Sequence, residues 1–385
     1  MASKGKILYL VAEDWYFCSH RLQLACAARD EGYEVVVATR VTAHGDEITK
    51  SGLKLIPINM CRSGLNPLSE LPSLLHLIRI YRQERPDLVH HVALKPVIYG
   101  SLAAAVTAIP AKINALGGLG FAYSSESKKA RLLRAMLRVV LRMLLNRSNS
   151  KVILQNNDDL ETLVNASILK PDRAAVIRGA GVDLQEFSLS AEPDEPPVVM
   201  LASRMLWSKG VGEFVEAASL LNKRGVVARY ILVGEADAVN PASIPREQLL
   251  KWQQEGVVEW WGRRDDMADV LRQAHIVCLP SYREGLPKVL LEAAASGRAI
   301  VASDAPGCRE VVHHNENGLL IPVKKSVPLA DAIEQLVSDP VLRRKMGARG
   351  REIVVEGLSL EQVVSETLAL YREGIIGSNA NRSSS

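Results

Sequence analysis

Strand-length apolar runs alternate with amphipathic stretches along nearly the whole chain, and this alternation limits the fold more than any other feature. Seven runs fit strands in the first half, at residues 6–12, 33–39, 53–58, 88–93, 111–116, 151–156 and 174–179. Six more follow, at residues 198–203, 229–234, 257–262, 276–281, 299–304 and 318–323. Continuous apolar strands separated by helices indicate parallel sheets covered on both faces. The two series therefore predict an α/β chain with two doubly wound, Rossmann-like domains.

The length of 385 residues suits two domains of roughly 150–200 residues each. An acidic, proline-rich segment at residues 182–197 is interpreted as the linker between them. The expected domains are therefore residues 1–185 and 186–359. Residues 377–385, GSNANRSSS, are expected to be a disordered tail.

Composition excludes several classes of protein. The chain is 48% hydrophobic and 23% charged, as is typical of a globular protein, and its net charge of +4 is too small to indicate nucleic-acid binding. The five cysteines show no C-x-x-C spacing, which favours reduced thiols in a cytosolic protein. No secretory signal is expected from the first residues, and because the sequence contains no apolar run of 18 residues, no membrane span is expected.

The segment 281–297, SYREGLPKVLLEAAASG, joins a buried strand to a helix. Glu284 and Glu292 bracket seven residues, Pro287 suits the first helical position, and Gly297 suits the helix end. Unpaired N–H groups at such a helix start can receive anions and sugar hydroxyls. The alternative is an ordinary strand–loop–helix connection with two surface glutamates.

A second strand–loop–helix segment carries two cations. Residues 198–210, VVMLASRMLWSKG, form an apolar strand followed by Arg204 and Lys209, with a helix opening near Gly210. Two cations beside a helix amino terminus suit a diphosphate. A structural ion pair for Arg204, and a solvated lysine for Lys209, are the alternatives.

Residues 128–151 hold eight basic residues and no acidic one. Four arginines recur at helical spacing among apolar side chains, at positions Arg131, Arg134, Arg138 and Arg142. A basic amphipathic helix suits an anionic membrane surface. A core helix with a solvated basic face is the alternative.

Taken together, SRMLWSKG and the later Glu–x7–Glu pattern resemble the retaining nucleotide-sugar glycosyltransferases of family 4. The resemblance extends over nearly the whole chain and is strongest to the branch that extends lipid-linked oligosaccharides for lipopolysaccharide O-antigens and other bacterial glycans. Other shared segments are SHR (19–21), KPVIYG (95–100), LVGEADAVNP (232–241), the residues that follow Glu284 up to position 312, and NGLLIP (317–322). The resemblance implies the GT-B fold, in which two Rossmann-like domains face a central cleft. In this fold a carboxyl-terminal helix, here about 360–376, crosses back to the first domain.

The resemblance implies a donor site in the second domain. Ser203, Arg204 and Lys209 would bind the diphosphate, Glu284 the transferred sugar, and Glu292 the ribose hydroxyls. The amides of Gly285, Leu286 and Lys288 would line the sugar or phosphate, and Pro287, which has no N–H, would shape the turn. The loop around Arg263 would hold the nucleobase through backbone atoms. Alternatively, Arg263 and Arg264 are surface residues that form ion pairs with Asp265 and Asp266.

The first domain would hold the acceptor, through Ser19, His20, Arg21, Lys95 and Gly118. Ser19 fits a helix cap, which would put His20 and Arg21 in the first turn. His20 is either a base or orienting group, or a structural histidine. Gly118 belongs to a glycine-rich loop, ALGGLGFAY (115–123), expected to line the cleft. His90 is assigned mainly to the strand core, because relatives often read H-x-H where this chain has Val92 at the second histidine.

The resemblance implies transfer of a sugar, such as N-acetylgalactosamine, from a UDP donor to an undecaprenyl-diphosphate-linked acceptor with retained configuration. Arg204, Lys209, Glu284 and His20 are the candidate catalytic residues. The chain lacks a D-x-D triplet, so no metal and no cofactor are expected. A nucleotide-sugar epimerase, a sugar phosphorylase and a non-catalytic scaffold are the alternatives. The expected location is the cytoplasmic face of the inner membrane, with peripheral contact through residues 128–147 and no nucleic-acid partner.

Overall fold

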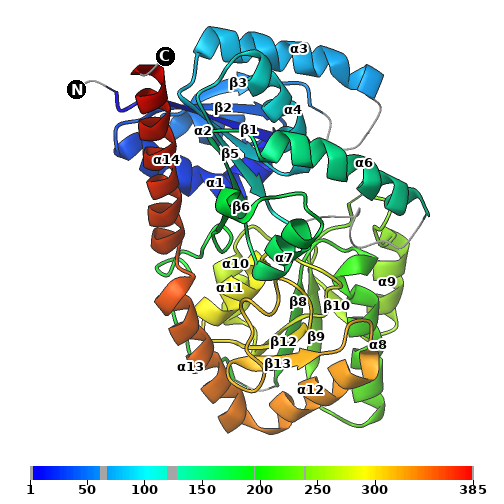
Figure 1. Cartoon of the computed structure of the whole chain (residues 1–385). Helices are drawn as coiled ribbons and strands as arrows, with labels where there is room; N and C mark the ends of the chain where they lie inside the picture. Colours follow the sequence, from blue (N-terminus) through cyan, green and yellow to red (C-terminus); the bar gives the residue numbers. More distant parts are fainter. Residues whose placement is uncertain (1–2, 61–66, 119–127, 195, 238–239, 384–385) are drawn as a thin grey trace. The chain divides into compact units, whose positions relative to one another are not determined.

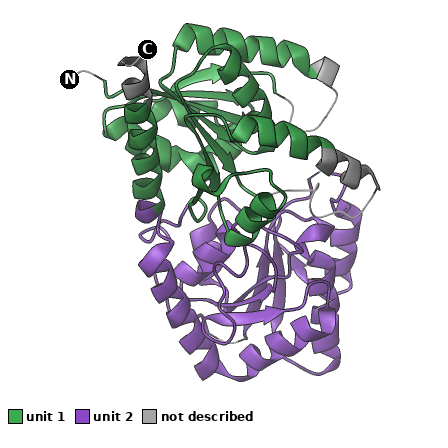
Figure 2. Cartoon of the chain, viewed as in Figure 1, with its two compact units in different colours: residues 1–180, 363–385 green, residues 181–362 purple. Residues whose placement is uncertain are grey.

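The computed structural model describes residues 3–60, 67–118, 128–194, 196–237 and 240–383, with the backbone alone at 67–69, 128–135 and 378–383. Two compact units make up the chain (Figure 2), Met1–Ala180 with Val363–Ser385, and Gly181–Gln362. Each unit is a parallel sheet covered by helices (Figure 1). All thirteen apolar runs form strands, which confirms the predicted α/β class.

The sheet of the first unit has seven strands in the order β3-β2-β1-β4-β5-β6-β7. The strands are β1 (Lys6–Glu13), β2 (Glu34–Arg40), β3 (Lys54–Pro57), β4 (Leu88–Val92), β5 (Ala111–Leu116), β6 (Ser150–Leu154) and β7 (Ala174–Val176). The helices are α1 (Asp14–Asp30), α2 (Gly45–Lys50), α3 (Pro67–Glu84), α4 (Leu94–Val106), α6 (Lys128–Leu145), α7 (Asn157–Asn165), the short η1 (Pro171–Arg173) and α14 (Leu360–Ser383).

The sheet of the second unit has six strands in the order β10-β9-β8-β11-β12-β13. The strands are β8 (Val198–Ala202), β9 (Arg229–Val233), β10 (Glu259–Trp260), β11 (Ile276–Leu279), β12 (Ala299–Ser303) and β13 (Gly318–Ile321). The helices are the short η2 (Trp207–Lys209), α8 (Val211–Lys223), α9 (Arg246–Gln254), α10 (Met267–Arg272), α11 (Lys288–Ala295), α12 (Ser326–Ser338) and α13 (Pro340–Gly357).

Alternation along the central strand β1 explains why helices cover both faces of the first sheet. Ile7 and Tyr9 pack in a buried cluster with α1 and α14, whereas Leu8 and Leu10 pack in another with α3 and α4. Successive side chains of a strand point to opposite faces, so both faces of this strand are apolar. None of the described helices combines the length and the apolar character needed to cross a bilayer.

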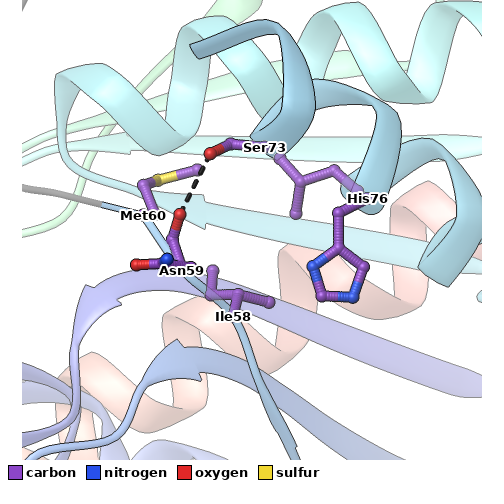
Figure 3. A pocket seen from close by; sticks show the side chains of 6 residues that line it. Ile58, Asn59, Met60, Ser73 and His76 are labelled. Atoms are coloured by element: carbon purple, nitrogen blue, oxygen red, sulfur yellow. Dashed lines mark hydrogen bonds between the residues drawn. The ribbon is translucent and has the colours of Figure 1, made fainter. Parts of the chain in front are cut away.

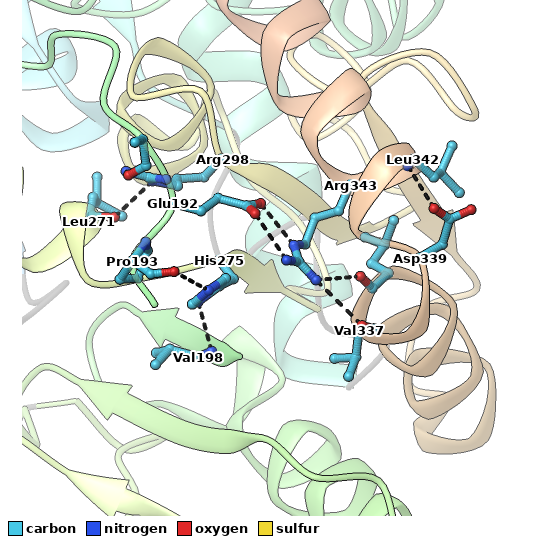
Figure 4. A network of polar contacts seen from close by, with 12 residues as sticks. Glu192, Pro193, Val198, Leu271, His275, Arg298, Val337, Asp339, Leu342 and Arg343 are labelled. Atoms are coloured by element: carbon cyan, nitrogen blue, oxygen red, sulfur yellow. Dashed lines mark hydrogen bonds and ion pairs between the residues drawn. The ribbon is translucent and has the colours of Figure 1, made fainter. Parts of the chain in front are cut away.

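The predicted linker is held firmly on the second unit (Figure 4). Arg343 donates from Nε and Nη2 to both carboxylate oxygens of Glu192, at 2.8 and 2.9 Å. His275 donates from Nε2 to the Pro193 carbonyl at 3.1 Å, and the buried Arg298 donates to carbonyls on either side. These buried side chains order the segment on the second compact unit, which begins at Gly181.

The carboxyl-terminal helix is longer than the sequence indicates. The predicted helix ends near residue 376, and the tail from residue 377 was expected to be disordered, but α14 continues to Ser383. Extending an existing helix adds one hydrogen bond per residue and does not repeat the unfavourable nucleation step. Residues 377–383 of the predicted tail thus belong to α14 in the structure, and residues 384–385 lie outside the described part of the chain.

Candidate active site

The two motif-bearing loops of the second unit follow neighbouring strands. β8 pairs with β11 in parallel, so the loops that leave their carboxyl ends meet at one edge of the sheet. Open parallel sheets bind ligands at this edge. The loop after β8 carries Arg204 and Lys209, and the loop after β11 carries Glu284.

Lys209 and Glu284 form an ion pair across this edge. The Lys209 Nζ lies 2.5 Å from Glu284 Oε1, and both side chains are largely buried. Gly210, with φ of 74°, lets the two loops approach, because a Cβ there would lie 2.1 Å from the Pro280 carbonyl oxygen. Only glycine fits this combination of positive φ and close backbone contact. The structure thus brings together the lysine that is predicted to bind a diphosphate and the glutamate that is predicted to bind the transferred sugar.

Arg204 is positioned by a residue that the sequence analysis missed. Its Nη1 donates to Asp237 Oδ2 at 2.9 Å, from the loop after β9. Gly234, with φ of 136°, lets that loop pass the Ser203 carbonyl, which a Cβ would approach to 1.8 Å. β9 is the other neighbour of β8. An acidic residue after a predicted strand was the available signal, but the strand order was needed to use it.

The Glu284 loop also rests on the loop after β12. The Glu284 amide donates to the Pro306 carbonyl at 3.1 Å. At Gly307, with φ of 80°, a Cβ would lie 2.5 Å from the Gly285 carbonyl oxygen and 2.8 Å from that of Glu284. Gly307 was also missed, because this contact depends on the pairing of β11 with β12.

Glu292 lies on α11, one turn beyond its start. Its side chain is 6% exposed, and Oε1 lies 3.2 Å from the Lys288 ammonium. Burial raises the pKa of Glu292, Lys288 offsets part of this effect, and Glu186 adds to it. The helix begins at Lys288, so Pro287 is the N-cap and not, as predicted, the first helical residue. Gly285 and Leu286 form the preceding turn.

The Arg263 side chain pairs within its own loop. Its guanidinium is exposed and pairs with Asp265 at 3.0 Å, and Arg264 pairs with Asp266. The two side chains therefore make the surface ion pairs that the sequence analysis held as the alternative. The backbone of the same loop contacts the loop after β9, since Gly234 donates its amide to the Gly262 carbonyl at 2.7 Å.

In the first unit, helix α1 begins six residues earlier than predicted, at Asp14 and not at His20. Ser19 is exposed within the second turn and not a cap, and His20 stacks on Tyr16 with ring centroids 4.1 Å apart. Arg21 is 4% exposed and faces the core. The prediction of a first-turn SHR segment is therefore wrong.

Asp14 is the reason for this earlier start. Its buried carboxylate accepts hydrogen bonds from the Thr42 hydroxyl and from the amides of Thr42, Ala43 and His44, at 2.6 to 3.0 Å. Burial raises the pKa of Asp14, but these hydrogen bonds outweigh burial and hold it well below its usual range. The loop after β2 is thereby fastened to the start of α1.

Lys95 lies at the amino-terminal end of α4, as expected. Its ammonium pairs with Glu70 of α3 at 2.7 Å, and both side chains are largely buried. Glu70 was not predicted. Gly118 has φ of 110° and ends the described part of its loop, and the remainder of the predicted glycine-rich loop lies outside the described residues.

His90 is completely buried in β4, in agreement with its assignment to the core. Its Nδ1 lies 2.5 Å from the Tyr371 hydroxyl, which in turn lies 2.8 Å from that of Tyr9. Burial, together with Arg21, lowers the pKa of His90 well below its usual value. A neutral histidine in this network links α14 to the sheet.

Two further observations concern ligands. Within the described residues, no group of three or more histidine, cysteine, aspartate or glutamate side chains is arranged to hold a metal ion. A small pocket in the first unit is lined by Ile58, Asn59, Met60, Ser73, His76 and Leu77 (Figure 3). None of the predicted site residues lines this pocket.

Comparison with known proteins gives matches to both halves of the chain. The family model described as glycosyl transferase 4-like matches residues 6–156, and the one described as glycosyl transferases group 1 matches residues 196–339. The N,N'-diacetylbacillosaminyl-diphospho-undecaprenol alpha-1,3-N-acetylgalactosaminyltransferase of Campylobacter jejuni is 31% identical, with 84% of this chain and 87% of the relative covered. The UDP-Gal:alpha-D-GlcNAc-diphosphoundecaprenol alpha-1,3-galactosyltransferase of Escherichia coli is 22% identical, with 82% and 83% covered.

Solved structures share the fold. Sucrose-phosphate synthase from Thermosynechococcus elongatus superimposes with a TM-score of 0.80 at 20% identity, covering 96% of this chain and 99% of that one. Anabaena HepE in complex with UDP gives 0.76 at 19% identity, covering 96% and 100%. The two parallel sheets and these likenesses confirm the predicted GT-B fold. The chain therefore belongs to the group 1, family 4-like glycosyltransferases.

Proposed function

We propose that this glycosyltransferase moves an N-acetylhexosamine from a UDP-sugar to an undecaprenyl-diphosphate-linked acceptor, in the synthesis of a bacterial surface glycan. The Lys209–Glu284 pair carries the proposal, because it joins a diphosphate-binding cation to a carboxylate that suits sugar hydroxyls. The named activities of the Campylobacter jejuni and Escherichia coli relatives, both on undecaprenyl-diphosphate-linked sugars, support the acceptor class. The name of the second also specifies a UDP donor.

In the proposed reaction the diphosphate leaves while the acceptor hydroxyl attacks from the same face of the sugar, so the anomeric configuration is retained. The departing diphosphate takes the hydroxyl proton, and no enzymic nucleophile is required. Arg204 and Lys209 stabilise the negative charge that develops on the leaving group, an effect worth about 3–4 kcal/mol for a well-placed donor. Glu292 would accept hydrogen bonds from the ribose, and the first unit would bind the acceptor.

A donor panel tests this function. UDP-, GDP- and ADP-linked sugars are incubated with a short-chain lipid diphosphate acceptor, and the products are identified by mass spectrometry and NMR. We expect an α-linked product from a UDP-N-acetylhexosamine. An isomerised donor, or a free sugar phosphate, would instead identify an epimerase or a phosphorylase, and binding without turnover would identify a scaffold.

We also propose that the reaction requires no metal ion, since Arg204 and Lys209 lie on the loop that leads into the start of α8, and cations beside a helix amino terminus suit a diphosphate. Activity is measured with excess chelator and then with added Mg²⁺ or Mn²⁺. We expect equal rates. Loss of activity in chelator that a divalent cation restores would contradict the proposal.

Helix α6 suits peripheral contact with the cytoplasmic face of an anionic membrane. Four apolar side chains at helical spacing are exposed on it, namely Met136 (62%), Val139 (59%), Val140 (36%) and Met143 (66%). Arg138 and Arg142 are exposed beside them, and Leu137 and Leu141 pack into the core instead. An apolar ridge flanked by arginines fits a surface of anionic lipids, at up to about 1 kcal/mol per basic residue.

Flotation with vesicles of phosphatidylglycerol and phosphatidylethanolamine tests this contact. Replacing Met136, Val139 and Met143 by serine, or Arg131, Arg134, Arg138 and Arg142 by glutamine, should abolish flotation at moderate salt. The matched control replaces three valines of the second unit that are also more than half exposed, Val227, Val341 and Val355. Equal flotation of all variants would remove α6 from the proposed surface.

A further inference from the structure

Tyr282 connects the two loops of the proposed donor site through contacts that the mechanism above does not use. Tyr282 lies two residues before Glu284, and its amide donates to the Ser208 carbonyl at 3.0 Å, next to Lys209. The neighbouring Ser281 hydroxyl donates to the same carbonyl at 3.2 Å. The backbone that carries Glu284 is thus fastened to the turn that carries Lys209.

The side chain makes a second connection. The Tyr282 hydroxyl donates to Glu213 Oε1 at 2.6 Å. Glu213 lies in the first turn of α8, which begins at Val211, two residues after Lys209. Lys209 is therefore bracketed on both sides by contacts from one residue, through Ser208 before it and Glu213 after it.

From these contacts we infer that Tyr282 is a positioning residue, which holds Lys209 and Glu284 at their working separation. The inference rests on the role proposed above for that pair. A hydrogen bond to a carboxylate is stronger than one between neutral groups. Burial raises the pKa of Tyr282 and Glu213 raises it further, so the hydroxyl remains a donor throughout the working pH range.

The Tyr282 ring is held as well as the hydroxyl. The Lys324 ammonium lies 4.8 Å from the ring centroid, from the segment after β13. Lys324 has φ of 61°, which is uncommon for a residue other than glycine. A cation over a tyrosine ring is attracted by the ring electrons. Removing the whole ring should therefore disturb the site more than removing the hydroxyl.

The role is specific to the site, since Tyr282 belongs to neither apolar core cluster of the second unit. Loss of its hydroxyl should therefore leave the sheet and both clusters unchanged. The effect should fall on the geometry of the two loops, where a shift of about 1 Å can lower a rate by about 100-fold.

The test compares Tyr282→Phe, Glu213→Ala, their double variant and Glu213→Gln. Tyr230→Phe is the matched control, because the Tyr230 hydroxyl is buried in the same unit and has no hydrogen-bond partner among the residues that the structure describes. For each variant we measure kcat, the donor KM, the Kd of UDP by calorimetry, and Tm.

We expect Tyr282→Phe and Glu213→Ala each to lower kcat about 10- to 100-fold and to weaken UDP binding about three- to tenfold. Their Tm values should stay close to that of the wild type. The double variant should be no worse than either single variant, because both remove one interaction. Glu213→Gln retains an acceptor oxygen and should restore most of the activity, and Tyr230→Phe should behave as the wild type.

Wild-type kcat and UDP affinity in Tyr282→Phe would overturn the inference. Losses of kcat that are additive in the double variant would also overturn it, and so would losses accompanied by a lower Tm. UDP affinity is measured without turnover. If the wild type transferred none of the donor sugars, the proposed function would fail, while the UDP titration would still decide whether Tyr282 positions Lys209.

Discussion

Lys209 and Glu284 are 75 residues apart in the sequence, yet their charged groups lie 2.5 Å apart in the folded chain. Each therefore neutralises the other in the structure. Under the proposed function, a diphosphate that engages Lys209 would share the ammonium with Glu284, or release the carboxylate toward the sugar. The pair would then couple recognition of the two parts of the donor.

This coupling predicts opposite effects on UDP binding for the two partners. Lys209→Ala leaves the carboxylate unpaired and removes a phosphate contact, so turnover should fall about 100-fold and UDP should bind more weakly. Glu284→Gln frees the ammonium, so UDP should bind at least as tightly while transfer is lost. Calorimetry with UDP and a transfer assay check both. Lys251→Ala on the exposed part of α9 is the control, and equal UDP affinity in all three proteins would contradict the coupling.

Glu292→Gln should stabilise the protein without ligand and weaken donor binding. The folded-state pKa of Glu292 is raised, so the folded protein binds this proton more tightly than the unfolded chain. Ionisation of Glu292 therefore lowers the free energy of unfolding above the unfolded pKa, and that loss is recovered as pH falls through the folded pKa.

Donor affinity should change in the other direction, because the ionised carboxylate is the better acceptor for ribose hydroxyls. The donor KM should rise as pH falls through the raised pKa, and Glu292→Gln should remove that dependence. Denaturant titrations and KM measurements between pH 5 and 8 check this. A Glu255→Gln control, on an exposed side chain, should follow the wild type.

Breaking the Glu192–Arg343 pair should destabilise the second unit strongly. Arg343 is 2% exposed and its guanidinium would lose both carboxylate bonds, so Glu192→Ala should cost about 3–5 kcal/mol. Denaturant unfolding at pH 7 measures the change. Arg224→Ala removes two exposed ion pairs, to Asp331 and Glu334, and should leave the free energy of unfolding nearly unchanged.

The same pair predicts acid sensitivity. Burial raises the pKa of Glu192, but Arg343 outweighs burial and lowers it below the usual value. Its contribution is present above the unfolded pKa and is lost as pH falls through the folded pKa. The wild type should therefore lose stability below about pH 4.5 by more than Glu192→Ala does, and parallel pH profiles of the two proteins would contradict this assignment.

Gly210→Ala and Gly225→Ala separate backbone strain from steric contact. Both glycines have nearly the same φ, 74° and 76°, but a Cβ meets the Pro280 carbonyl at Gly210 and nothing within 4 Å at Gly225. Gly225→Ala should cost about 1–2 kcal/mol and keep full activity. Gly210→Ala should cost more and displace Lys209 from Glu284, with loss of turnover. Similar activities in the two variants would contradict this explanation.

The strands and the motif-bearing loops could be predicted because their signals are local. Apolar runs of strand length identify β8 and β11, and residues just beyond a parallel strand lie at its carboxyl edge wherever the strand is in the sheet. This is why Arg204, Lys209 and Glu284 could be placed at the carboxyl edge of the sheet without knowledge of strand order.

The partners of these residues could not be predicted in the same way. Asp237 meets Arg204 across 33 residues and Glu213 meets Tyr282 across 69, through the order β9-β8-β11-β12. Local capping rules also failed at Ser19, where Asp14 has the loop after β2 as a long-range partner.

The amino-acid sequence by itself determined the α/β class, the thirteen strands and the residue types at the site, because side-chain periodicity and motif spacing act over a few residues. Only the tertiary structure decided which charges neutralise one another, which glycines allow the loops to touch, and that buried arginines hold the linker. Those features depend on distances between segments far apart in the chain, which strand pairing alone brings within hydrogen-bonding range.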